Sequence, residues 1–177
     1  MTRWMTAALV VLFVPVAAHA QHQPYGGLQE RSVKALSDEQ IADLRAGRGM
    51  GLALAAELNG YPGPVHVLEL ADPLALSALQ RQRITELFEA MRTEATALGE
   101  RLIVAETGLD RQFSTRAVTE ASLVEGVQAI AMVQAALRSA HLKYHLATVE
   151  VLTPEQVARY AELRGYAGGA TGLHKHR

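Results

Sequence analysis

The sequence predicts an all-α protein built on a long antiparallel helical hairpin with short flanking helices. Three observations support this class. Aromatic residues make up 5% of the 177 residues while alanine and leucine abound, which favours helices over a β-sandwich core. Apolar residues recur with steps of three and four through two long stretches, which is the pattern of helices packed along each other. A five-residue unit typical of helix starts occurs three times.

The first 20 residues have the pattern of a secretory signal peptide. Arg3 supplies a positive start, residues 7–16 (AALVVLFVPV) are apolar, and residues 18–20 (AHA) form a small-x-small cleavage site. The apolar run is short for a membrane span, although an uncleaved anchor or a buried first helix would share its hydrophobicity. We therefore expect an exported protein that is cleaved after Ala20.

The composition of the remaining chain excludes several kinds of function. The sequence has no cysteine, so neither a disulfide nor a thiolate ligand can form. Of the 17 Lys and Arg residues, all but Arg3 follow the signal segment, where they face 18 acidic residues. This near balance gives no reason to expect binding to nucleic acid or to an anionic membrane.

The chain after residue 20 has the length of one domain with two loose ends. Residues 21–35 contain Pro24, Gly26 and Gly27 without lasting periodicity, which predicts a flexible N-terminal arm. Residues 36–165 are expected to form a single all-α domain, and the glycine-rich residues 166–177 a disordered tail. Glycines and prolines divide the first part of the domain into short helices near 38–46, 50–58 and 64–71.

The three repeated units share a leucine, a hydroxyl residue, two further residues and a glutamine: Leu36-Ser37-Asp38-Glu39-Gln40, Leu76-Ser77-Ala78-Leu79-Gln80 and Leu152-Thr153-Pro154-Glu155-Gln156. The hydroxyl can accept a hydrogen bond from the third helical amide, and the glutamine can reach back to the amide of the cap. Pro154 takes the first helical position, where its missing N–H costs nothing. Each unit therefore predicts a capped helix start that contributes about 1 kcal/mol.

The two long helices follow from the apolar spacing. The unit at 76–80 opens a helix with the seam Ile84, Phe88, Met91, Ala95, Leu98, Leu102, Ala105 and Leu109. After a turn near 113–115, a second helix begins between 116 and 120 with the seam Leu123, Val127, Ile130, Gln134, Leu137, His141, Tyr144 and Thr148. Because the connection is short, the two helices are expected to run antiparallel. Thr153 then caps a last short helix that ends near residue 163.

A candidate metal site lies on the second long helix. His141 and His145 are four residues apart, so both imidazoles lie on one helix face. The antiparallel arrangement places them opposite residues 85–91, where Glu89 and Met91 could complete a site for Zn, Cu, Ni or Co. The alternative is a polar break in the seam, in which His141 forms a hydrogen bond with Tyr144 or Glu89.

The other histidines offer weaker sites. His66 could join Glu69 or Glu57, although a histidine beside a turn is more often a capping or packing residue. His174 and His176 in the expected tail, and His22 in the expected arm, have little fixed geometry. No cofactor is required by any motif in the sequence.

Two further expectations concern surfaces and catalysis. The hairpin has more apolar positions than one seam needs, so a client-binding or dimer face is expected around Leu98, Leu102, Ile103 and Val127. The glycine-rich residues 47–51 lack the P-loop lysine, and the sequence has neither a G-x-S-x-G elbow nor an H-E-x-x-H helix. We expect no enzymatic activity.

Over residues 74–165 these features resemble the Spy/CpxP superfamily of periplasmic proteins. That superfamily is named for its LTxxQ motif, which Leu152-Thr153-Pro154-Glu155-Gln156 matches and Leu76-Ser77-Ala78-Leu79-Gln80 matches with serine. The resemblance implies a periplasmic homodimer of the envelope-stress response that holds unfolded proteins without ATP. Related members bind Zn, Cu, Ni or Co, confer heavy-metal resistance, or signal metal occupancy to a membrane-bound sensor partner. The Spy cradle is strongly basic, whereas this chain is slightly acidic after residue 20.

Overall fold

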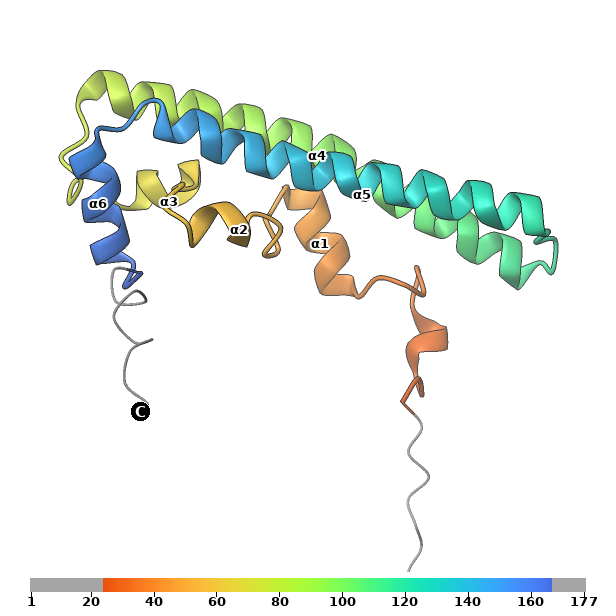
Figure 1. Ribbon diagram of the computed structural model, residues 1–177. Coiled ribbons are helices and arrows are strands. Elements are labelled where there is room, and N and C mark those ends of the chain that lie inside the picture. The colour runs from red at the N-terminus through yellow and green to blue at the C-terminus, as the bar shows by residue number, and fades with distance from the viewer. Residues whose placement is uncertain (1–23, 167–177) are drawn as a thin grey trace, which may run out of the picture.

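The computed structural model describes residues 24–166, and every regular element in this range is a helix. The prediction of an all-α protein is therefore confirmed for the described residues. The elements are η1 (Leu28–Glu30), α1 (Asp38–Ala46), α2 (Leu54–Glu57), α3 (Pro64–Glu69), α4 (Ala78–Ser114), α5 (Glu120–Val149) and α6 (Pro154–Leu163) (Figure 1). The expected signal peptide and residues 167–177 of the expected tail lie outside this range.

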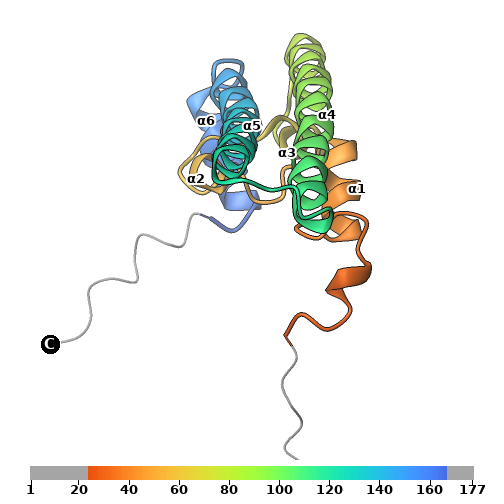
Figure 2. The same cartoon turned by 90° about the vertical axis from the view of Figure 1, so that its right-hand side faces the viewer.

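Two long antiparallel helices carry the other elements on one side. α4 and α5 lie next to each other along their length, and α1, α2 and α3 follow one another beneath them (Figures 1 and 2). α6 folds back at the end where α4 begins, while the opposite end, near residues 115–119, extends past α1 (Figure 1). In the described range, no helix combines the length and the apolar character that crossing a membrane requires.

The capped helix starts occur where the repeated units predict them. Ser37, Ser77 and Thr153 each accept a hydrogen bond from the backbone amide three residues later, and the glutamine there accepts one from the amide of the cap. Thr119 forms a fourth capping box with Ser122 at the start of α5. The sequence analysis did not identify this box, because serine replaces the glutamine.

Two of the three units are also joined to each other. The side-chain amide of Gln80 donates to the Val151 carbonyl at 2.9 Å and to Gln156 Oε1 at 2.8 Å. In return, the amide of Gln156 donates to Gln80 Oε1 and to the Leu74 carbonyl, both at 3.2 Å. The repeated glutamines therefore close their own capping boxes and also hold the starts of α4 and α6 together.

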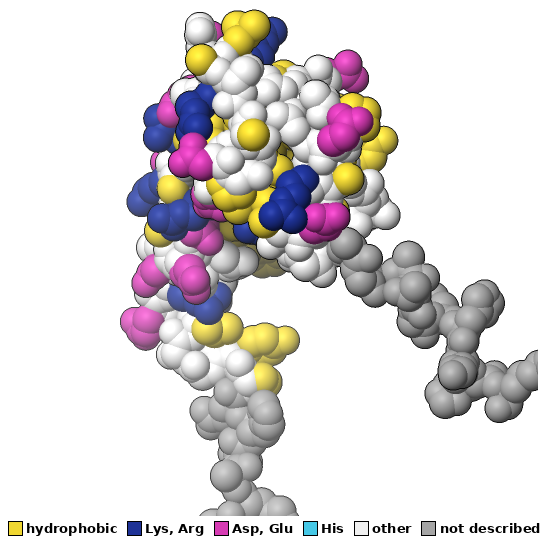
Figure 3. Space-filling view, turned by 90° about the vertical axis from the view of Figure 1, so that its left-hand side faces the viewer, with side chains coloured by type: hydrophobic (Ala, Val, Ile, Leu, Met, Phe, Trp, Pro, Cys, Tyr) yellow, Lys and Arg dark blue, Asp and Glu magenta, His cyan; other side chains and the backbone are white. Residues whose placement is uncertain are grey.

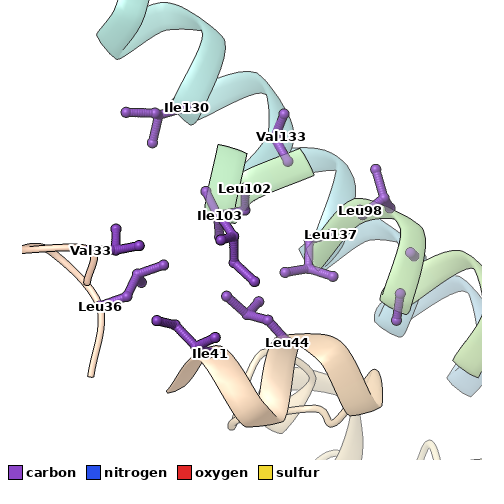
Figure 4. Packing of buried hydrophobic residues seen from close by; sticks show 12 residues of the cluster. Val33, Leu36, Ile41, Leu44, Leu98, Leu102, Ile103, Ile130, Val133 and Leu137 are labelled. Carbon is purple, nitrogen blue, oxygen red and sulfur yellow. The ribbon is translucent and has the colours of Figure 1, made fainter. Parts of the chain in front are cut away.

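The larger apolar core lies where the N-terminal segment crosses the long helices. Leu36, Ile41 and Leu44 point into the space between α4 and α5 (Figure 4). A Cβ atom built on Gly99 of α4 would lie 2.5 Å from the Leu44 carbonyl oxygen, so only glycine permits this approach of α1. Val33 is buried in the same core, so the segment expected as a flexible arm is packed at its C-terminal end.

This core corrects the expected client or dimer face. Leu98, Leu102 and Ile103 are each less than a tenth exposed, because α1 and residues 33–36 cover them. Val127 lies beyond the covered part of α5 and is 49% exposed. Three of the four expected face residues therefore contact the chain's own N-terminal segment.

A smaller apolar core lies at the α6 end of the molecule. It joins α3, the start of α4 and α6, and its buried members are Val67, Ala71, Leu74, Leu76, Ile84, Leu152 and Tyr160. Leu76 and Leu152 are the first residues of two repeated units, so the leucine of the unit anchors each cap in this core. Tyr160, at 2% exposure, brings α6 into the core.

Two elements differ from the prediction for identifiable reasons. α2 is limited to Leu54–Glu57, because Met50 and Gly51 adopt φ values of 42° and 77° that end any helix there. On α5, Val133 and Ala140 are buried, whereas Val127 and Gln134 are exposed. The buried face of α5 is rotated toward α1, a neighbour that the periodicity of α5 alone does not reveal.

Candidate functional site

A cavity of about 630 Å³ opens beneath the part of the two long helices that lies toward α3 and α6. Its walls come from the loop 46–51, from α2, from the start of α3, and from inward-facing residues of α4 and α5. Phe88, Met91, His141 and His145 face it from the long helices, and Glu57 faces it from α2. The cavity therefore combines apolar walls with a few titratable side chains, which is the usual composition of a binding site.

His145 is held in one orientation by backbone groups. Its Nδ1 lies 2.6 Å from the Tyr61 carbonyl oxygen, and because a carbonyl can only accept, Nδ1 carries the proton. The ring lies against Gly63, where an added Cβ would lie 2.9 Å from Cε1 and 3.0 Å from Nε2. In the neutral ring, Nε2 is left with a free lone pair.

His141 lies one helical turn before His145 and is 2% exposed. Its Nε2 is buried and has no hydrogen-bond partner among the described residues. Burial, and then the neighbouring His145, hold the pKa of His141 below its ordinary value, so the ring is neutral at neutral pH. A buried nitrogen without a partner is rare in native structures.

The expected hydrogen-bonding partners of His141 are engaged elsewhere. The Tyr144 hydroxyl donates to Glu94 Oε2 at 3.1 Å, and Lys143 donates to the same carboxylate. Glu89 accepts from Arg92 at 2.5 Å. The alternative interpretation of His141, a polar break satisfied by Tyr144 or Glu89, is therefore not what the structure shows.

Three of the four predicted metal ligands line the same cavity. Met91 is 6% exposed and lines it together with His141 and His145. Glu89 does not line the cavity: it lies two residues from Met91, on the opposite side of α4, and is paired with Arg92 on the surface. Glu89 is therefore removed from the candidate set. Met50, which the sequence analysis did not select, contributes a second thioether to the cavity wall.

Glu57 is a buried carboxylate at the edge of the cavity, with 7% exposure. Its Oε2 accepts the Gly63 amide at 3.1 Å and lies 3.8 Å from His145 Nδ1. Its Oε1 accepts from the Tyr160 hydroxyl, and from the Tyr166 hydroxyl at 3.3 Å. Burial, and then the bond to Glu57, raise the pKa of Tyr160 far above its usual range, so the hydroxyl keeps its proton.

Sequence reasoning considered Glu57 only as a partner for His66. The structure pairs His66 with Glu69 of its own helix, where Nδ1 lies 3.0 Å from Oε2. His66 lines the cavity but makes no contact with Glu57 among the described hydrogen bonds and ion pairs. His22, His174 and His176 lie outside residues 24–166. The position of Glu57 had no periodic signal, because α2 is a single turn.

The side chains at the cavity that could donate a lone pair to a metal ion are mostly neutral imidazoles and thioethers. Within residues 24–166, His, Asp and Glu side chains do not gather in threes where they could share a metal ion. A metal ion bound by His141 and His145 would consequently take its third protein donor from a thioether of the cavity wall, Met91 or Met50. Thioether sulfur prefers soft cations.

Comparison of the chain with protein families, with curated proteins and with solved structures found no match in any of the three.

Proposed function

We propose that this protein is an exported, periplasmic metal-binding protein that holds one soft or borderline transition-metal ion through His141, His145 and Met91. The observation that carries the proposal is the buried Nε2 of His141, which has no hydrogen-bond partner among residues 24–166. A ligand that accepts a lone pair from this nitrogen would remove the cost of leaving it unpaired.

The environment of His145 supports the same proposal. Histidines that bind metals commonly donate their second ring N–H to a carbonyl or carboxylate, which fixes the tautomer and the ring orientation. The Nδ1 of His145 has this arrangement with the Tyr61 carbonyl, and Glu57 Oε2 lies 3.8 Å from the same nitrogen. The Nε2 lone pair of His145 is then available to a cation.

Among Zn, Cu, Ni and Co, the donor set favours copper in its monovalent state. His141, His145 and Met91 are all neutral donors, and bringing a singly charged ion into a partly buried site costs less than bringing a doubly charged one. Imidazole and thioether together suit Cu(I), whereas the divalent ions gain more from carboxylate or water. The bound ion would supply a fixed positive charge at the cavity.

The test is a competition titration of purified residues 21–177 with Cu(I) and a chromophoric Cu(I) chelator. We expect one tight site, a loss of at least tenfold in affinity for His141→Ala and for His145→Ala, and a similar loss for Met91→Leu. Met132→Leu is the matched control, because Met132 is 73% exposed and lies outside the cavity. Undiminished Cu(I) binding by the double variant His141→Ala, His145→Ala would refute the proposal.

The resemblance to the Spy/CpxP superfamily is part of this proposal. Under this proposal, α4 and α5 correspond to the long hairpin of the superfamily, and the units at 76–80 and 152–156 correspond to its LTxxQ motifs. Metal binding would then place the protein in the metal-responsive branch, with a membrane-bound sensor as its partner.

A second candidate function, holding unfolded proteins as a homodimer or monomer, is favoured by one observation. Large apolar side chains are exposed on α4 and α5 between the level of α1 and the turn near residues 115–119: Val104, Phe113, Val124, Val127 and Met132. The opposite end of the molecule, where α6 lies, shows basic and acidic side chains interspersed (Figure 3).

Suppression of aggregation tests the second candidate. We expect residues 21–177 to keep an unrelated unfolding protein soluble at near-stoichiometric amounts without nucleotide. The double variant Val104→Ser, Val127→Ser should weaken this effect, whereas Thr96→Ser, a conservative change away from these residues, should not. Aggregation that proceeds unchanged at a tenfold excess of the protein would exclude this function.

A further inference from the structure

We propose that Glu57 links the metal site to the C-terminal helix α6, so that metal binding and the docking of α6 strengthen each other. This inference rests on the proposed function, since it concerns regulation of the same site. It starts from a single carboxylate that contacts two parts of the molecule at once.

One oxygen of Glu57 holds α6 and the residues after it. Oε1 accepts hydrogen bonds from the Tyr160 and Tyr166 hydroxyls, and Arg164 Nε lies 4.0 Å away. Tyr160 is 2% exposed and is the buried residue of α6. The C-terminal half of α6 is therefore fixed to the body of the protein through this oxygen and the ring of Tyr160.

The other oxygen of Glu57 faces the cavity. Oε2 accepts the Gly63 amide at 3.1 Å and lies 3.8 Å from His145 Nδ1. Gly63 in turn packs against the ring of His145. The proposed ligand His145 and the helix α6 therefore share Glu57 as a common neighbour, although His145 and Tyr160 belong to different helices.

The physical coupling is electrostatic. A buried carboxylate is costly unless donors and positive charge surround it. A cation on Nε2 of His145 withdraws electron density from the ring and makes Nδ1–H more positive, which favours the Glu57 anion in its present place. In this position Glu57 also accepts hydrogen bonds from the Tyr160 and Tyr166 hydroxyls. The bound ion therefore stabilises the docked position of α6.

The effect must be reciprocal. If metal binding strengthens the docking of α6 by some factor, docked α6 strengthens metal binding by the same factor. Glu57 is therefore a positioning residue that acts through His145, and α6 reports whether the site is occupied.

Hydrogen exchange of the α6 amides in the metal-free and Cu(I)-loaded protein tests the coupling directly. We expect the amides of residues 158–163 to exchange about tenfold more slowly in the loaded protein, which is a coupling within the usual range. In Glu57→Gln, the side chain carries no charge, and its one carbonyl oxygen can still accept from the tyrosines at the cost of the bond from the Gly63 amide. We expect this variant to keep α6 docked but to lose most of the metal-dependent change.

Affinity for Cu(I) tests the reciprocal effect. Tyr160→Phe keeps the buried ring but removes the hydroxyl, and we expect about tenfold weaker binding of Cu(I). If this variant is not folded by circular dichroism, Tyr166→Phe provides the same measurement at a less buried position. Tyr144→Phe is the control, because its hydroxyl bonds Glu94 rather than Glu57 and its loss should leave the affinity unchanged.

The outcomes separate the two proposals. If the protein binds Cu(I) through His141 and His145 but α6 exchange is the same in both states, the coupling is wrong and the metal site stands. The same conclusion follows if Tyr160→Phe and Tyr166→Phe, when folded, bind Cu(I) as tightly as the parent protein. If the parent protein binds no Cu(I), both proposals fall together.

Discussion

At the scale of single residues, Gly99 sets the distance between α1 and α4. A Cβ at this position would lie 2.5 Å from the Leu44 carbonyl oxygen and 2.9 Å from its carbon, and both are backbone atoms that cannot rotate away. We expect Gly99→Ala to lower the free energy of unfolding by about 1–3 kcal/mol, because α1 must shift to relieve the overlap. Urea unfolding monitored by circular dichroism measures this change.

Gly108 provides the matched control for this prediction. It lies in the same helix, and a Cβ there would meet no atom within 4 Å. Alanine should therefore raise the free energy of unfolding by about 0.5–1 kcal/mol, since glycine is the poorer helix former. Equal effects of the two substitutions would show that α1 does not approach α4 as described.

His141 makes stability depend on pH. Its pKa in the folded protein lies below the ordinary value of 6.5, because burial and the nearby His145 disfavour the charged ring. As the pH falls below 6.5, the unfolded chain binds a proton that the folded protein does not, and the free energy of unfolding decreases. The decrease continues down to the folded pKa, with a slope of at most about 1.4 kcal/mol per pH unit.

The measurement is urea unfolding of the metal-free protein between pH 5 and pH 8, compared with His141→Gln. Glutamine does not titrate, so the variant should lose the contribution of His141 to the pH dependence of the free energy of unfolding. Its free energy of unfolding should therefore decrease less on acidification. Parallel pH profiles for the two proteins would show that His141 is not kept neutral by burial.

The candidate site could be predicted from the sequence only in part. His141 and His145 were found because a four-residue spacing fixes two side chains on one helix face, and Met91 because it belongs to the facing seam. Glu89 was a wrong choice, since the sequence gives the approximate level of a residue along the pair but not its rotation about the axis. Glu57 and Met50 could not be found, because short turns place them and no periodicity marks such turns.

At the scale of elements, the repeated units differ in the hydrogen bonds that each glutamine forms outside its own helix. Gln156 closes its own capping box and also bonds Gln80 and Leu74, whereas Gln40 closes a box without a partner on another helix among the described hydrogen bonds. We expect Gln156→Ala to cost about 2 kcal/mol, since cap and part-buried bonds are lost together, and Gln40→Ala to cost about 1 kcal/mol or less.

A double-mutant cycle on Gln80 and Gln156 isolates the bonds between the two helices. The two single substitutions should be non-additive by about 0.5–1.5 kcal/mol, because either one breaks the shared amide pair. Strict additivity would mean that the glutamines serve only their own helices.

Helix starts were the most predictable elements of this chain. Ser37, Ser77 and Thr153 cap α1, α4 and α6 as the sequence predicts, since a capping box is a local interaction that the sequence states directly. The buried face of α5 was less predictable, because its rotation depends on α1. The length of α2 depends on two positive φ values, one of them at Met50, where the residue type gives no warning.

At the scale of the whole molecule, the N-terminal segment completes the core of the long helices. Leu44 is 2% exposed and lies against residues from both α4 and α5. We expect Leu44→Ala to lower the free energy of unfolding by about 2–5 kcal/mol. Leu98, Leu102 and Ile103 would then become more accessible, so binding of a hydrophobic dye should increase before global unfolding.

Leu52→Ala is the comparison for this prediction, because Leu52 packs against the same core but is only partly buried. A similar loss of stability for both variants, or no increase in dye binding by Leu44→Ala, would contradict the role of α1 as a cover. The sequence could not predict this cover, since it arises from contacts between residues more than fifty positions apart.

The one-sided support of α4 and α5 has a mechanical consequence. One part of the pair rests on α1, α2, α3 and α6, while among residues 24–166 no helix packs beneath the turn around residues 115–119 (Figure 1). The pair therefore resembles a beam clamped at one end, whose bending amplitude increases with distance from the clamp. Bending motions should consequently be largest at the tip that exposes Phe113 and Val124. The cavity, which lies in the supported part of the pair, should change little in shape.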